Sequence, residues 1–301
     1  MNRRTCLHGL SALGLLPLTS GWLPTEESIL VRSIPSTNEK IPAVGLGTWQ
    51  TFDVDNSESE RAPLKEVLKT LVAKGGSVVD SSPMYGSSEK VVGDLSSELH
   101  LNDKLFIATK VWTSGKEAGI RQMNNSFALL RRKKIDLLQI HNLLDWPTHI
   151  KTLRDWKEEG KVRYIGITHY TEGAYSNIEQ IIKTTPLEFL QINYSMLSRK
   201  AEERLFPLAQ EKKIAVIINQ PFESGALFSR VKGKTLPVWA KEFDCSSWGQ
   251  FFLKFIVANP AVTCVIPGTS KPHHMLDNLG AGIGKLPTAD HVKQMIALIA
   301  Q

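Results

Sequence analysis

Short apolar runs alternate with longer stretches of helical periodicity over most of the chain. We expect the apolar runs to be strands, at 43–47, 77–80, 105–110, 135–140, 163–167, 188–192, 214–219 and 262–266. We expect helices at 60–74, 88–99, 117–131, 148–159, 173–183, 201–211, 246–258 and 288–299. In the first helix the apolar positions fall on one face: Leu64, Val67, Leu68, Leu71 and Val72. This alternation predicts a parallel sheet whose strands are joined by helices.

Such a sheet is either an open, doubly wound layer or a closed barrel. Eight strand–helix units over about 270 residues fit a (β/α)8 TIM barrel, which typically has about 250. A doubly wound dinucleotide-binding sheet usually carries three spaced glycines after its first strand. Here that segment reads Gly45-Leu46-Gly47-Thr48-Trp49, and Trp49 stands where close backbone approach is needed. We therefore expect one barrel domain over residues 25–301, opened by a β-hairpin from the runs 29–34 and 41–47.

Residues 1–24 have the order of an export signal. Arg3 and Arg4 precede a modest apolar run at 7–18, and small residues follow at 19–21. The apolar run is too short to span a bilayer, so we expect no membrane span in the mature chain. The paired arginines suggest twin-arginine export to the periplasm. The match is partial, because Cys6 replaces the usual aromatic residue and no Ala-x-Ala is present. A cytoplasmic protein with a dispensable extension is the alternative.

Charge and cysteine content exclude some classes of function. The formal net charge is +6, but the basic residues are scattered and the densest run, 131–134, fits a solvated helix end. No aromatic interleaving or known module supports nucleic-acid binding. Three cysteines do not form a disulfide framework. Cys264 lies in an apolar run, which predicts a buried inert thiol, and a bridge to Cys245 stays open.

Titratable side chains end three of the expected strands. These are Asp80, Lys110 and His141, and Tyr85 follows Asp80 after a Ser-Ser-Pro turn. Taken singly, each has an ordinary structural reading as a turn, packing, solvated or core residue. In a barrel, however, the carboxyl ends of all strands meet at the face that carries the chemistry. We therefore expect the four side chains to converge.

Together these groups suit proton donation to a carbonyl oxygen as hydride reaches its carbon. Tyrosine is a reluctant acid, with a pKa near 10. A nearby ammonium favours phenolate and lowers that pKa, and a carboxylate can hold the ammonium in place. Lys110 and Asp80 could play these parts, and a neutral His141 could orient the carbonyl. No metal-ligand spacing appears in the chain.

The chain resembles an aldo-keto reductase from about Ile29 to Ile299. The segments that carry the resemblance occur in the family's order: Gly45–Trp49, Asp80–Tyr85, Thr109-Lys110, Ile140-His141, Gly166–His169, Gln191–Tyr194 and Ile266–Ser270. The resemblance implies NAD(P)H-dependent reduction of aldehydes and ketones without metal or flavin. Tyr85 would be the general acid, and Asp80, Lys110 and His141 would complete the catalytic tetrad. We expect NADPH with NADH as the alternative, a small carbonyl substrate and a monomer.

The resemblance also assigns positions to the cofactor: Thr168, His169, Gln191, Asn219, Pro267, Gly268, Thr269, Ser270, Lys271, His274, Asp277 and Asn278. The first three match positions that hold the nicotinamide carboxamide, and the last two match positions that meet the adenine. The stretch 269–271, before a helix start at 272, could meet a ribose 2′-phosphate. The family commonly has lysine at the Gly268 position and arginine at the His274 position, so strict NADPH preference is open. Asn219 stands where an aromatic often stacks on the nicotinamide.

Three apolar side chains just beyond strand ends, Trp49, Met84 and Trp112, are expected to form the mouth of a substrate pocket. Two other classes of function remain open. One is a non-catalytic cofactor-binding or sensing protein on the same barrel. The other is a barrel isomerase or lyase acting on a phosphorylated substrate, which would turn over without consuming reduced nicotinamide.

Overall fold

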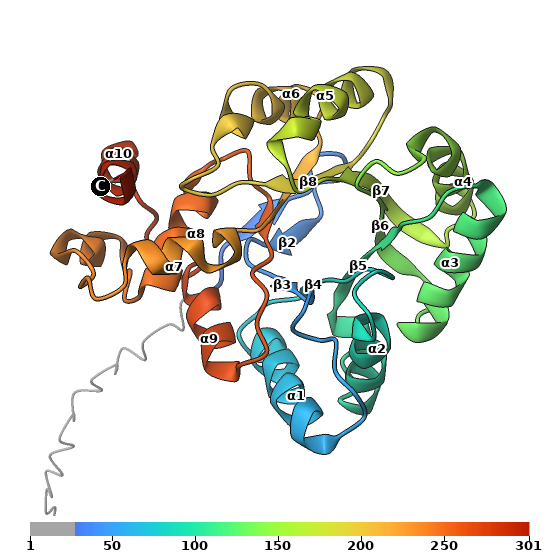
Figure 1. The fold of residues 1–301 in the computed structure, drawn as a ribbon, viewed down its shortest axis with the longest axis horizontal. Coiled ribbons are helices and arrows are strands. Elements are labelled where there is room, and N and C mark those ends of the chain that lie inside the picture. Colours follow the sequence, from blue (N-terminus) through green and yellow to red (C-terminus); the bar gives the residue numbers. More distant parts are fainter. Residues whose placement is uncertain (1–27, 301) are drawn as a thin grey trace, which may run out of the picture.

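The computed structural model describes residues 28–300, and a nearly closed barrel dominates it (Figure 1). Eight parallel strands lie in chain order in one sheet. They are β3 (Leu46–Gly47), β4 (Val78–Asp80), β5 (Phe106–Val111), β6 (Ile135–His141), β7 (Val162–Thr168), β8 (Phe189–Asn193), β9 (Ala215–Asn219) and β10 (Cys264–Val265). Bridges Val44–Val265 and Gly47–Gly268 bring the two edges together. All eight predicted strands are confirmed, and the first and last are shorter than expected.

Helices follow the strands and surround the sheet (Figure 1). They are α1 (Glu58–Ala73), α2 (Ser88–Glu98), α3 (Lys116–Leu129), α4 (Trp146–Glu158), α5 (Tyr175–Thr184), α6 (Leu205–Glu211), α7 (Ala226–Arg230), α8 (Trp248–Ala258), α9 (Pro272–Gly280) and α10 (Ala289–Ala300). Short 3-10 turns are η1 (Asn102–Lys104), η2 (Glu172–Ala174), η3 (Lys200–Glu202), η4 (Glu223–Gly225) and η5 (Val238–Phe243). The predicted helices are all present, and the expected helix start at 272 is the start of α9, whereas α7 was not predicted.

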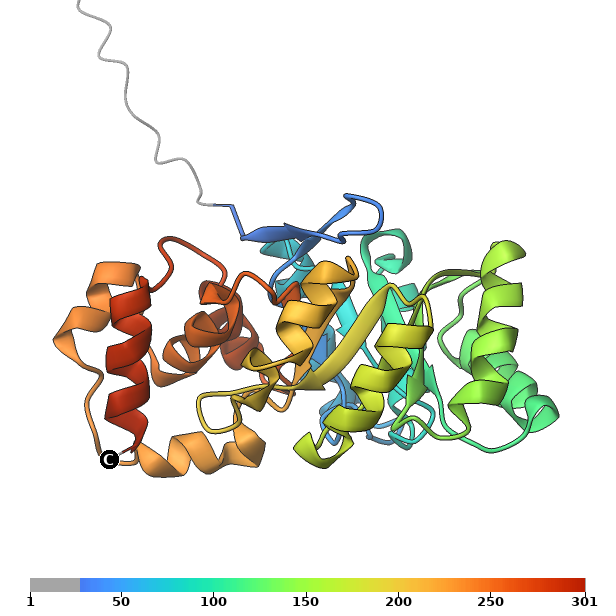
Figure 2. The same cartoon turned by 90° about the horizontal axis from the view of Figure 1, so that it is seen from above.

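A hairpin covers one side of the barrel (Figure 2). Strand β1 (Val31–Ser33) pairs antiparallel with β2 (Lys40–Pro42), as the sequence predicts. Ile34 and Ile41 of the hairpin are buried in the same cluster as the side chains that fill the barrel interior. The hairpin therefore closes the amino-terminal end of the barrel and leaves the carboxyl ends of the strands for a site. The predicted export signal at 1–24 lies outside the described residues.

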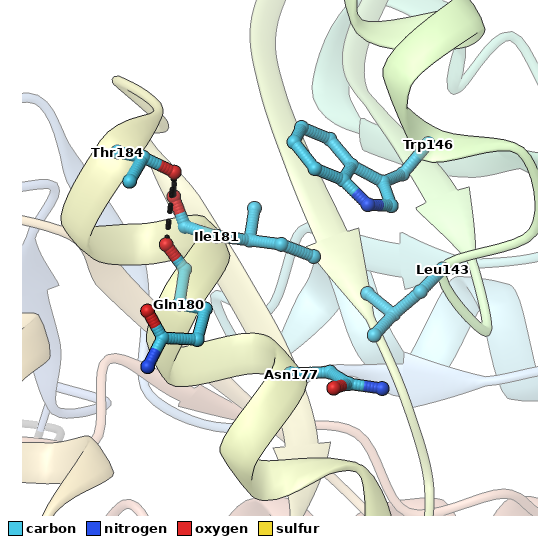
Figure 3. A pocket seen from close by; sticks show the side chains of 6 residues that line it. All are labelled: Leu143, Trp146, Asn177, Gln180, Ile181 and Thr184. Carbon is cyan, nitrogen blue, oxygen red and sulfur yellow. Dashed lines mark hydrogen bonds between the residues drawn. The ribbon is translucent and has the colours of Figure 1, made fainter.

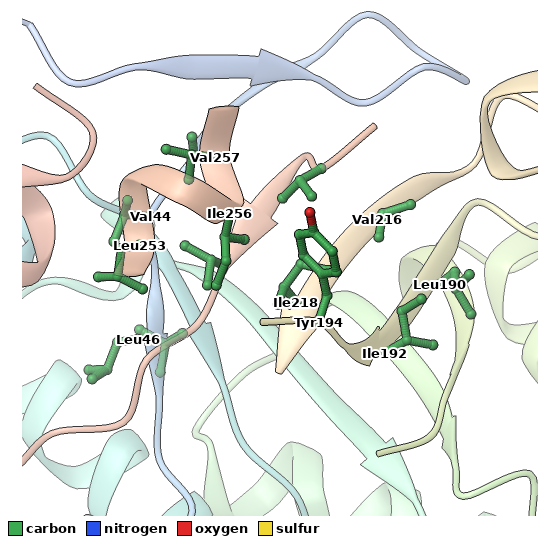
Figure 4. Packing of buried hydrophobic residues seen from close by; sticks show 14 of the residues in the cluster. Val44, Leu46, Leu190, Ile192, Tyr194, Val216, Ile218, Leu253, Ile256 and Val257 are labelled. Carbon is green, nitrogen blue, oxygen red and sulfur yellow. The ribbon is translucent and has the colours of Figure 1, made fainter. Parts of the chain in front are cut away.

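Apolar side chains pack on both faces of the sheet. In β9, Ala215 and Ile217 join the interior cluster, and Val216 and Ile218 join the larger cluster outside it. Figure 4 shows this outer layer, where strand side chains meet Leu253 and Ile256 of α8. Burial on both faces explains why these strands read as unbroken apolar runs.

The two described cysteines are free, so they form no bridge to each other. Both thiols are buried, and burial raises the pKa of each well above its usual value. Within residues 28–300, no helix is long and apolar enough to cross a membrane.

Candidate active site

Four predicted side chains meet at the carboxyl ends of β4, β5 and β6. The Lys110 ammonium lies 2.6 Å from Asp80 Oδ2 and also donates to the Ser81 carbonyl at 2.8 Å. Neither side chain is appreciably exposed. Lys110 Nζ is 4.9 Å from the centre of the Tyr85 ring, and the Tyr85 ring meets the His141 ring edge-on at 5.8 Å. The structure therefore brings together the residues that the strand ends predicted.

The pKa of Tyr85 corrects one expectation. The sequence predicted a pKa lowered by Lys110, but the pKa is raised above its usual value. Burial is the largest cause, because it disfavours phenolate, and the Asp80 charge adds to it. Lys110 acts in the predicted direction and offsets only part of the increase. The phenol is therefore held protonated at neutral pH.

Lys110 and His141 differ in charge state. Burial is the largest single effect on Lys110 and lowers its pKa, but attraction to Asp80 and Tyr85 and hydrogen bonds to both together outweigh it, so the net pKa is raised. Burial lowers the pKa of His141 to about 2, and repulsion by Lys110 and His169 contributes. Lys110 is thus a cation and His141 a neutral imidazole at working pH. Ser82 Oγ lies 3.0 Å from His141 Nδ1 and fixes the ring orientation.

Two amides hold the second oxygen of Asp80. Gln191 Nε2 donates to Asp80 Oδ1 at 2.8 Å, and Gln139 Nε2 does so at 3.3 Å. Thr168 Oγ1 in turn donates to Gln191 Oε1 at 3.1 Å. The sequence reasoning missed Gln139, although its position two residues before His141 on β6 places it on the same face of the strand. A polar residue inside an apolar strand was the signal.

A cavity of about 690 Å³ opens above the four side chains. Asp80, Tyr85 and His141 reach its wall, and Lys110 lies beneath them. The predicted substrate residues all line it: Trp49, Met84 and Trp112. Asn142, Tyr170 and Phe222 line it as well and were not predicted as substrate contacts. No lysine or arginine is among its lining residues within the described chain.

The predicted nicotinamide positions lie partly in the wall of this cavity. Thr168, Gln191 and Asn219 line it, and His169 does not. His169 Nδ1 accepts hydrogen bonds from the backbone of Tyr170 and Thr171, which leaves Nε2 as the protonated nitrogen. Asn219 Nδ2 donates to the His169 carbonyl, and Asn219 Oδ1 is buried without a partner in the part of the chain described.

The predicted adenine-end positions form a separate group around the start of α9. Gly268 is exposed and lines the cavity, whereas the other seven do not: Pro267, Thr269, Ser270, Lys271, His274, Asp277 and Asn278. Lys271 and His274 are exposed. The carboxylate of Asp277 already accepts hydrogen bonds from Ser247 and Gln250. The roles of these positions stay predictions.

A second, smaller hollow of about 300 Å³ lies between the β6–α4 turn and α5 (Figure 3). It is lined by Leu143, Trp146, Asn177, Gln180, Ile181 and Thr184. None of these side chains is ionisable, so the chemistry belongs to the larger cavity.

Comparison with known proteins shows the family of this chain. The sequence model described as "Aldo/keto reductase family" matches residues 43–298, so the chain belongs to the aldo/keto reductase family. It is 28% identical to methylglyoxal reductase YeaE of Escherichia coli over 81% of this chain and 86% of that protein. It is 24% identical to aldo-keto reductase YhdN of Bacillus subtilis over 62% of this chain, and the match spans 60% of YhdN. A Klebsiella pneumoniae aldo/keto reductase solved with NADP and acetate has a TM-score of 0.73 and 22% identity, covering 90% and 95% of the two chains.

Proposed function

We propose that the protein reduces aldehydes and ketones to alcohols with NAD(P)H, and that Tyr85 supplies the proton. The observation that carries the proposal is the buried Lys110–Asp80 pair, with its ammonium 4.9 Å from the Tyr85 ring at the base of the cavity. Family membership supports the reaction class.

Each side chain has a distinct part in the proposed step. Tyr85 is protonated at neutral pH and transfers its proton to the carbonyl oxygen as negative charge develops there. The phenolate left behind is buried, and Lys110 stabilises it, as its pKa-lowering effect on Tyr85 indicates. Asp80 keeps Lys110 charged and in place. His141 is neutral, so it can hydrogen-bond the carbonyl without competing as an acid.

The residues around the cavity fit a nicotinamide. A carboxamide offers both N–H donors and an acceptor oxygen, and Asn219 presents a buried acceptor without a partner among residues 28–300. Thr168, Gln191 and Asn219 would hold that end, and positions 267–278 would hold the adenine end. When bound, the reduced cofactor supplies the hydride. We propose NADPH as the cofactor. NADH is the alternative, because Gly268 and His274 lack the positive charge that the family commonly has at these positions for the 2′-phosphate of NADPH.

The cavity wall indicates neutral, largely apolar carbonyl compounds as substrates. Trp49, Met84, Trp112, Tyr170 and Phe222 contribute apolar surface. No described lysine or arginine lines the cavity to bind a phosphate or carboxylate. This argues against the isomerase or lyase alternative with a phosphorylated substrate.

A turnover assay tests the proposal. Purified protein is mixed with NADPH and a panel of neutral aldehydes, and both cofactor oxidation and alcohol formation are measured. We expect one alcohol for each cofactor oxidised. A change in cofactor fluorescence with no alcohol formed would instead establish the non-catalytic sensing alternative.

For the remaining finer points, we propose that residues 1–24 direct twin-arginine export and that the mature barrel domain is a periplasmic monomer. Arg3, Arg4 and the apolar run 7–18 support export. Mass spectrometry of the N-terminus after expression in a bacterial host tests it, since an intact leader in the cytoplasm would favour the alternative. Sedimentation measures the oligomeric state.

A further inference from the structure

Gln139 is a fully buried amide inside the barrel, beneath the cavity. It pairs in register with Lys110 of β5 on one side and with Gly166 of β7 on the other. Its side chain has no exposed surface, and it does not line the cavity. Any ligand in the cavity can therefore contact Asp80 and Gln191, which line it, but not Gln139.

Only one end of the Gln139 amide forms a hydrogen bond. Its Nε2 donates to Asp80 Oδ1, whereas its Oε1 is buried and has no hydrogen-bond partner within residues 28–300. An unsatisfied buried acceptor costs stability, and an apolar side chain of similar shape would avoid that cost. Any favourable contribution of Gln139 to the site must therefore come from its Nε2 donor, whose hydrogen-bond acceptor is Asp80 Oδ1.

Asp80 Oδ1 also accepts a hydrogen bond from Gln191, which differs from Gln139 in its position relative to the cavity. Gln191 reaches the cavity wall, so a bound ligand can compete for its amide. Gln139 lies below and stays out of reach. Resting on the proposed function, we propose that Gln139 is a positioning residue that holds the Asp80 carboxylate, and through it the Lys110 ammonium, when a ligand engages Gln191.

Two variants test this role, with a matched control. Q139M keeps the volume and removes the donor and the orphan acceptor together. Q139E keeps the shape, and only its protonated form can donate to Asp80. The control is Y164F, which removes another hydrogen-bonding group inside the barrel. Tyr164 contacts Glu39 at the hairpin end, away from Asp80.

We expect kcat of Q139M to fall about 10-fold, because small displacements of catalytic groups are costly. The basic limb of its kcat profile should move to higher pH, since an unmasked Asp80 charge makes phenolate harder to form. Its melting temperature should equal or exceed that of wild type. Q139E should approach wild-type kcat at low pH and lose it as pH rises. Y164F should melt lower with an unchanged pH profile.

An unchanged kcat and pH profile in Q139M would overturn the proposal. So would a fall in activity that matches a fall in melting temperature, since that is a purely structural effect. If wild type itself shows no turnover, the proposed function fails separately. Gln139 is then judged by the crystal structure of Q139M: a displaced Asp80 carboxylate supports the role, and an unmoved one contradicts it.

Discussion

Lys110 is a charged side chain with no exposed surface, and Asp80 is what keeps it charged. Their positions at two neighbouring strand ends were readable from the sequence, because parallel strands end at one edge. The net pKa of Tyr85 was not readable. It depends on how much burial opposes Lys110, and burial depends on side chains distant in sequence such as His141, whose ring packs edge-on against Tyr85. The hydrogen bond from Gln139 was not predicted for the same reason, because its partner Asp80 lies 59 residues away in the sequence.

Removing the lysine should damage both stability and activity. K110M leaves the Asp80 carboxylate buried without its cation, which costs about 3–5 kcal/mol of unfolding free energy. We expect D80N/K110M to recover much of that stability and none of the activity. K254M is the control, because Lys254 is equally buried but donates to the Ile283 and Lys285 carbonyls. Urea unfolding and NADPH oxidation measure the two effects. Substantial activity in K110M would contradict the assignment.

Titration of His141 should not affect the pH dependence of kcat/KM near neutral pH. Its pKa is lowered to about 2, so the imidazole stays neutral from pH 5 to 8. We expect kcat/KM for a neutral aldehyde to be flat across that range. An acid limb near pH 6.5 that disappears in H141A would show that the imidazole titrates there, against this account.

At the scale of elements, α2 follows the Tyr85 turn directly, and the Ser88 N–H at its start donates to the Tyr85 carbonyl at 3.1 Å. Its Asp94 binds Arg61 of α1 at 3.1 Å, Lys90 at 2.6 Å and Arg131 at 2.6 Å. The sequence predicted α2 within one residue of its ends, but not the contacts of Asp94 with Arg61 and Arg131, because these join α2 to α1 and to the turn after α3. It placed the start of α9 at 272 but gave no end for it, because the short helix buries only Met275, Asn278 and Leu279. It also began α6 too early, because Arg204 has a non-helical φ of −139° and the helix starts after it.

The Asp94 cluster predicts a pH-dependent contribution to stability. Its cations lower the pKa of Asp94 to about 2, although burial alone would raise it. A depressed carboxyl pKa stabilises the fold above the unfolded value and loses that effect as pH falls through about 2. We expect D94N to cost about 1–2 kcal/mol at pH 7, after solvent screening, with the difference narrowing below pH 4.

Urea titrations between pH 3 and 7 measure this difference. D290N is the control, because the Asp290–Lys293 pair is largely exposed and contributes little. If the loss of unfolding free energy in D94N does not depend on pH, or if D290N loses as much, then the Asp94 cluster does not stabilise the fold through charge.

At the scale of the whole molecule, the barrel followed from counting strand–helix units. The cavity did not, because its walls come from loops such as 219–224, where Gln220, Glu223 and Ser224 adopt positive φ. Sequence alone does not reveal how such loops fold over the strand ends. The net charge of +6 also says little about the site, since no described lysine or arginine lines the cavity.

A cavity wall without a described lysine or arginine predicts discrimination by substrate charge. We expect kcat/KM for neutral aldehydes to exceed that for carboxylate-bearing aldehydes of similar size by at least about 10-fold, or about 1.4 kcal/mol. M84K places a cation at the half-exposed cavity mouth, which should attract carboxylate-bearing aldehydes. We expect it to reduce the difference in kcat/KM between the two substrate types at low salt, and to lose this effect at high salt because salt screens the charge. Equal kcat/KM values in wild type would contradict the assignment of the cavity as the substrate site.

The most direct test of the account is a single-turnover measurement on wild type and Y85F loaded with NADPH. Phenylalanine keeps the ring beside Lys110 and His141 and removes only the proton donor. We expect the rate of cofactor oxidation by a neutral aldehyde to fall at least about 100-fold in Y85F, in line with the usual worth of a general acid. Affinity for NADPH should stay within about twofold. Equal single-turnover rates in the two proteins would show that Tyr85 does not deliver the proton.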